Sequence, residues 1–123
     1  MQHRNLVINA LKFGIMEIKS INIRGCEVSA IFTGRAYYFT SNFYGLLCVA
    51  TEINESEDGR AFSVVTGNHH TDGTRLANSV VSSAAKKYIR KEENKYINKV
   101  VTFVDGVNRD LAADYITIQY EKR

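Results

Sequence analysis

The chain contains neither tryptophan nor proline. Proline is the residue that most often stiffens linkers, so its absence argues against a proline-rich tail or hinge. Long hydrophobic runs are missing as well, because no apolar stretch reaches the roughly 20 residues that a membrane-spanning helix needs. We therefore expect no membrane partner for this protein.

Cysteine is scarce: Cys26 and Cys48 are the two thiols, and they form no CxxC motif. The N-terminus lacks the cleavage site of a signal peptide. Two thiols without an export signal predict reduced, buried side chains in a cytoplasmic protein, with a disulfide as the alternative. Residues 1–15 are interpreted as an N-terminal extension, with Met16 as an alternative start.

With 123 residues, the chain is long enough for one domain and too short for two, so we expect a single domain over residues 1–123. Its hydrophobic fraction is 45% and its charged fraction is 24%, which is typical of a globular protein. The net charge is +3. This balance permits nucleic acid or an acidic protein surface as partner without requiring either.

Alternating apolar residues predict β-strands along most of the chain. The predicted strands cover residues 17–24, 26–33, 35–40, 44–53, 61–66, 99–104 and 115–121. Gly25 predicts a tight turn or bulge between the first two strands. The Asp58-Gly59 pair between two strand patterns predicts a hairpin.

The pattern changes to a helical period after residue 75. Apolar residues recur there at spacings of three and four, at positions 76, 77, 80, 81, 84, 85, 88 and 89. This predicts a long amphipathic helix, capped by Asp72 or Thr74. The expected fold is a single α+β domain in which an antiparallel meander carries this helix on one face and two more strands follow. An OB-like barrel is the alternative.

Aromatic side chains cluster in the stretch RAYYFTSNFYG, residues 35–45. The candidates for stacking on bases are Tyr37, Tyr38, Phe39, Phe43 and Tyr44. Successive strand residues point to opposite faces, so these rings cannot all be exposed. The alternative interpretation is that most of them fill the core.

The predicted helix is rich in basic residues towards its end. Candidates for phosphate or partner contact are Arg75, Lys86, Lys87, Arg90, Lys91 and Lys95. The spacing of four residues places the last five on adjacent ridges of the solvent side. The alternative is a solvated face that favours the helix dipole.

The loop between the last meander strand and the helix has two interpretations. A glycine-flanked loop that enters a helix is suited to bind an anion, here through Gly67, Asn68, Gly73 and Thr74. The same loop holds the weak metal-ligand candidates His69, His70 and Asp72. Adjacent histidines rarely point to one ion, so no metal site is assigned.

The sequence shows no nucleophile elbow and no paired carboxylates, so we expect neither an enzyme nor a cofactor. The first hypothesis is a nucleic-acid-binding accessory module for single strands or RNA, with rings and basic residues on one continuous surface. The alternative is a protein–protein effector that docks on a larger machine, comparable to phage or mobile-element inhibitors in size and lack of motifs alone. Self-association through an edge strand is compatible with both hypotheses.

Overall fold

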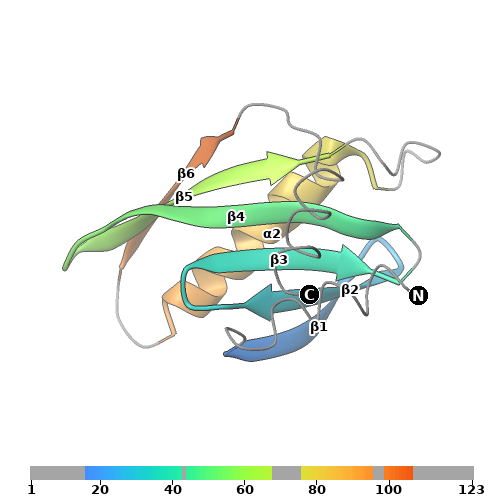
Figure 1. Ribbon diagram of the computed structural model, residues 1–123, viewed down its shortest axis with the longest axis horizontal. Helices are drawn as coiled ribbons and strands as arrows, with labels where there is room; N and C mark the ends of the chain where they lie inside the picture. The colour runs from blue at the N-terminus through green and yellow to red at the C-terminus, as the bar shows by residue number, and fades with distance from the viewer. Residues whose placement is uncertain (1–15, 43, 68–75, 96–98, 107–123) are drawn as a thin grey trace, which may run out of the picture.

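The computed structural model describes residues 16–42, 44–67, 76–95 and 99–106. They form one mixed sheet of six strands with one helix on it, as Figure 1 shows. The elements are β1 (Glu17–Ile23), β2 (Cys26–Phe32), β3 (Ala36–Ser41), β4 (Gly45–Glu55), β5 (Gly59–Thr66), α2 (Asn78–Glu93) and β6 (Val100–Asp105). The predicted single α+β architecture with a helix after the meander is confirmed.

The first five strands form an antiparallel meander in the order of the chain. The turn between β1 and β2 contains Arg24 and Gly25, both with positive φ, which is the conformation of a two-residue hairpin turn. The amide of Gly25 donates a 2.9 Å hydrogen bond to Asn22 Oδ1. The tight turn predicted at Gly25 is therefore confirmed.

The hairpin predicted at Asp58-Gly59 is also present, because β4 and β5 pair on either side of it. Gly59 was expected to be required by the turn, but its role in the structure is different. It does not have the positive φ of a primed turn, but a Cβ at this position would collide with the carbonyl oxygen of Val100. Glycine thus allows the close approach of β6 rather than the turn itself.

The pairing of β6 corrects the expectation of an antiparallel sheet. β6 pairs with β5 in parallel, with Gly59 opposite Val100 and Val64 opposite Asp105. The helix between them forms the crossover that parallel neighbours require. The last predicted strand, residues 115–121, lies outside the described residues.

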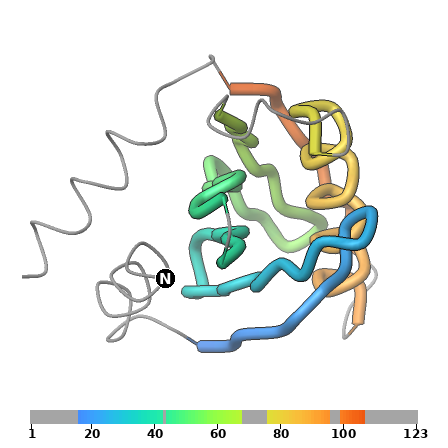
Figure 2. The backbone as a smooth tube through the Cα atoms, turned by 90° about the vertical axis from the view of Figure 1, so that its right-hand side faces the viewer, coloured from blue at the N-terminus to red at the C-terminus, as the bar shows by residue number. Residues whose placement is uncertain are grey.

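The OB-like alternative is wrong, because the described strands form an open sheet with β1 and β6 at its two edges. Figure 2 shows that the sheet curves around one side of α2. The core lies in this concave layer, where Val81, Ala85 and Ile89 of the helix pack against the sheet. Among the described residues, no helix has the length and apolar character to cross a membrane.

The beginning of the helix also differs from expectation. It starts at Asn78, and the preceding residue, Ala77, makes no side-chain cap hydrogen bond. The predicted caps Asp72 and Thr74 lie outside the described residues. The helix is instead held by its buried apolar stripe, which is the usual source of helix stability in proteins.

Candidate functional site

Two of the clustered rings lie between the sheet and the helix. Phe39 is fully buried, and Tyr37 is only 3% exposed. Both make edge-on contacts with Tyr88 of α2, at centroid distances of 5.9 Å and 6.2 Å respectively. These two rings therefore build the core and are not presented to solvent.

The other rings of the cluster are placed differently. Tyr38 lies on the face of the sheet opposite the helix, in the cross-strand row between Ile31 and Val49. Tyr44 is half-buried and packs against the core. Phe43 lies outside the described residues. The structure thus separates the rings rather than gathering them on one surface.

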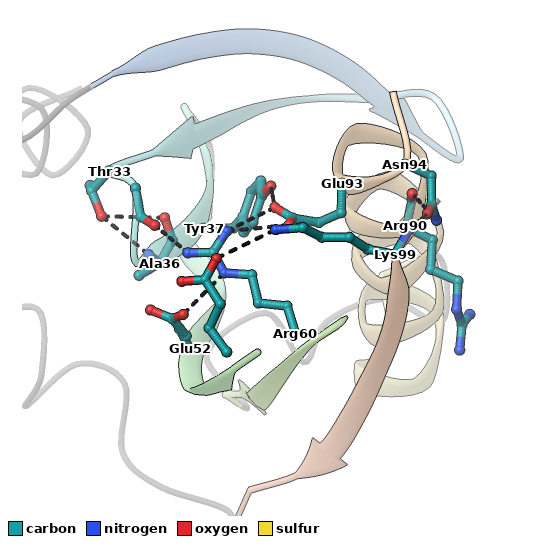
Figure 3. A network of polar contacts seen from close by, with 11 residues as sticks. Thr33, Ala36, Tyr37, Glu52, Arg60, Arg90, Glu93, Asn94 and Lys99 are labelled. Carbon is teal, nitrogen blue, oxygen red and sulfur yellow. Dashed lines mark hydrogen bonds and ion pairs between the residues drawn. The ribbon is translucent and has the colours of Figure 1, made fainter. Parts of the chain in front are cut away.

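A buried ion cluster joins the sheet to the last turn of the helix, and Figure 3 shows its side chains converging on Arg60. The Arg60 guanidinium contacts Glu52 of β4 at 3.2 Å and Glu93 of α2 at 3.1 Å. It also donates to the carbonyl oxygen of Gly34. The hydroxyl of Tyr37 donates to Glu93. The side chains of Arg60 and Glu93 are only 9% and 7% exposed, so their charges depend on each other for compensation.

The pKa values in this cluster follow from burial and pairing. Hydrogen bonding to Arg60 holds the pKa of Glu52 below its ordinary value. For Arg60, burial works against the charged form, but the carboxylates of Glu52 and Glu93 outweigh it and raise the pKa. Burial, reinforced by the hydrogen bond to Glu93, raises the pKa of Tyr37 far above its ordinary range. At neutral pH, Glu52 and Arg60 are therefore charged and the Tyr37 hydroxyl keeps its proton.

The neighbouring acid of the helix, Glu92, is also paired. Lys19 of β1 lies 3.0 Å from its carboxylate and Lys95 lies 3.3 Å from it. Burial disfavours the charged form of Glu92, yet these two lysines lower its pKa. Both acids of the helix thus point towards cations of the domain, away from the outer side of α2.

The outer side of α2 keeps an excess of positive charge as a result. We define the basic face as Lys87, Arg90 and Lys91, which are exposed and have no ion pair within the described part of the chain. Lys86, on its flank, pairs with Asp105 at 3.0 Å. Arg90 also lies over the Phe103 ring, 4.9 Å from the centroid, which restrains its position.

Two pockets lie near these residues. One, of about 230 Å³, borders the ion cluster and is lined by Phe32, Tyr37 and charged residues that pair within the domain. The other lies at the helix N-terminus and is lined by hydroxyl side chains, including those of Ser79 and Ser82. The charges of the first are already compensated, so a ligand would have to displace existing partners.

The remaining predicted site residues are in part outside the described chain. This holds for Arg75 and for the loop residues Asn68, His69, His70, Asp72, Gly73 and Thr74. Gly67 is described and buried. Within the described residues, no three His, Cys, Asp or Glu side chains come together as a metal site would require.

The two cysteines are free, so the alternative of a disulfide between Cys26 and Cys48 is wrong. Cys48 is fully buried in β4. Burial raises the pKa of its thiol to about 12, which keeps it protonated at neutral pH.

The ion cluster was not predicted from the sequence, although one signal was available. Glu92 and Glu93 are the acids of an otherwise basic helix, and they lie at its C-terminal end. The helix dipole disfavours negative charge there, so both residues need cations from elsewhere in the fold. Which cations supply the compensation depends on tertiary packing.

Protein-family models, curated proteins and solved structures were compared with this chain, and none of them matches it.

Proposed function

We propose that this protein is a non-enzymatic nucleic-acid-binding module that contacts the phosphate backbone with the basic face of α2. The observation that carries the proposal is the inward pairing of Glu92 and Glu93. Because the helix acids are compensated inside the domain, the charges of the basic face remain available to an external polyanion.

The proposed contact is electrostatic and independent of sequence. Tyr37 and Phe39 are buried, and Tyr38 lies on the opposite face of the sheet, so these rings are not beside the basic face. These rings are therefore not expected to stack on bases, and no preference for single strands over duplexes is expected. Backbone neutralisation predicts binding to duplex DNA, single strands and RNA with a steep salt dependence.

The test is fluorescence anisotropy with labelled single-stranded DNA, duplex DNA and RNA, from about 50 mM to about 200 mM salt. The double variant Lys87→Ala/Lys91→Ala is compared with Arg24→Asn/Arg35→Ala. The second variant removes the same charge from exposed turns elsewhere. We expect the helix variant to bind roughly tenfold more weakly and to reduce the salt slope by about 1 to 2.

Two results would overturn the proposal. Equal weakening by both variants would mean that net charge acts without a localised face. Absence of binding at the lowest salt would remove nucleic acid as the partner and leave the protein–protein effector, for which the same face would meet an acidic protein surface.

A further inference from the structure

Among the described strands, β6 forms an edge of the sheet with β5 on one side. Its even-numbered residues direct their backbone groups to β5: Val100 N donates to Asp58 O at 2.9 Å, and Gly106 N donates to Val64 O at 2.8 Å. The amides and carbonyls of Val101, Phe103 and Asp105 therefore point to the other side. This outward row is a template for a further strand.

The same strand exposes apolar side chains. Val100 is 64% exposed and Val104 is 52% exposed, although both are branched apolar residues within a strand. They lie on the face of the sheet away from α2, with the exposed Thr102 midway between them. Val101 and Phe103, which alternate with these residues along β6, point to the opposite face of the sheet and pack towards the core.

The sequence of this edge, KVVTFVD from residue 99 to residue 105, is complementary to itself when reversed about Thr102. An antiparallel pair of two copies places Lys99 opposite Asp105 of the second chain. It places Val100 opposite Val104, and Val101 opposite Phe103. We propose that two copies of this protein associate through β6 in this register, which forms one continuous sheet around a twofold axis at Thr102.

The backbone geometry agrees with this register. Val101 and Phe103 both direct their backbone amides and carbonyls outwards. In the dimer, Val101 of one copy therefore lies opposite Phe103 of the other, and the two residues exchange backbone hydrogen bonds. The pairs between Val100 and Val104 and between the two Thr102 residues then occupy non-hydrogen-bonded positions. Side chains approach most closely at such positions, so Val100 of one copy and Val104 of the other would bury each other's exposed surface.

The charges at the ends of the strand select this register. In the monomer, Asp105 contacts Lys86 at 3.0 Å and Lys99 contacts Glu55 at 3.4 Å, but the Asp105 and Glu55 side chains are 79% and 50% exposed. The Lys99 side chain is only 18% exposed, so in the dimer it would have to turn from Glu55 towards Asp105 of the second copy, giving each Asp105 a second cation. A shift by two residues would instead place Asp105 opposite the apolar Val101, losing the complementary pair.

The twofold axis runs perpendicular to the sheet, so both α2 helices would lie on the same side of the assembly. The basic faces of two chains would then be available to one partner. The association itself rests on β6 alone and does not depend on nucleic-acid binding. Failure of one proposal therefore leaves the other standing.

Cysteine cross-linking tests the register directly. Thr102→Cys, in a Cys26→Ser background, places two thiols opposite each other at a spacing that a disulfide can bridge. Cys48 is buried and serves as an internal control. We expect mild oxidation to yield a covalent dimer. Val100→Cys alone and Val104→Cys alone should not cross-link, whereas a mixture of the two should.

Charge exchange tests the same arrangement without oxidation. Sedimentation equilibrium of the unmodified chain should show a monomer–dimer equilibrium at concentrations up to roughly 1 mM. Lys99→Glu and Asp105→Lys should each weaken the homodimer roughly tenfold, and mixing the two variants should restore association. The double variant should dimerise like the original chain.

A monomer over the whole concentration range would overturn the proposal. Equal cross-linking of Thr102→Cys and Val100→Cys would also overturn it, because random collision would explain both. A dimer whose association is unchanged by every β6 substitution would show that the interface lies elsewhere, and this result would also overturn the proposal.

Discussion

Arg60 Nη1 of β5 lies 3.1 Å from Glu93 Oε2 at the end of α2, and both side chains are nearly buried. We expect Arg60→Met to destabilise the fold by about 3 kcal/mol, because it leaves the nearly buried carboxylate of Glu93 and the partly buried one of Glu52 without their cation. Urea denaturation measures the loss. The matched variant Lys86→Met, at the exposed pair with Asp105, should cost under about 0.5 kcal/mol. Similar losses from both variants would contradict the special role of the buried pair.

The hydroxyl of Tyr37 can be tested separately from its ring. Tyr37→Phe keeps the contacts with Phe32 and Phe62 but removes the hydrogen bond to Glu93. We expect a loss of about 2 kcal/mol, since the acceptor is charged and nearly buried. Tyr88→Phe, at a half-buried ring that contacts Tyr37, is the control and should cost under about 0.5 kcal/mol. Equal costs would show that the hydroxyl of Tyr37 is not special.

Stability should depend on pH through Glu52 and Glu92, whose pKa values are lowered in the folded state. The unfolded chain then binds protons more readily than the folded chain as pH falls. Their contribution is complete above the ordinary value of 4.5 and is lost as pH drops below it through the folded pKa. Thermal unfolding across this acidic range should show falling stability. Glu52→Gln should reduce the slope, and an unchanged slope would contradict the assignment.

Gly59 should be intolerant of any side chain. Gly59→Ala would force the added methyl against the backbone of Val100, so the start of β6 must move away from β5. Hydrogen exchange should then quicken at the amides of Val100 and nearby β6 residues, while β2 and β3 remain protected. Glu57→Ala, in the same hairpin and exposed, should leave exchange in β6 unchanged. Unaltered protection of β6 in Gly59→Ala would show that the contact can relax.

The sequence was most informative where the pattern is local. Alternation correctly located β2, whose residues Val28 and Ala30 face the core. The hairpin at Asp58-Gly59 was also predictable from its turn residues. The direction of β6 was missed, because an alternating strand looks the same in a parallel and in an antiparallel pair. The helix predicted between the two strands was the available signal, since such a crossover places neighbouring strands in parallel.

The candidate site was less accessible from sequence. The basic residues of α2 were found, since a helical period alone places Lys87 and Lys91 on the same side. Arg60 was missed because Glu93, its partner from α2, lies 33 residues away in the sequence, and only the docking of the helix brings the two together. The exposure of the aromatic cluster could not be decided either, because alternation predicts two faces without saying which of them the helix covers.

The parallel pairing of β5 with β6 has a consequence for how the chain folds. The meander consists of neighbouring hairpins, so each of its strands can find its partner over a short loop. β6 must instead await the formation and docking of α2 before Val100 reaches Gly59. We therefore expect β6 to join the sheet last on the folding pathway, leaving β5 as a temporary open edge while the protein is being made.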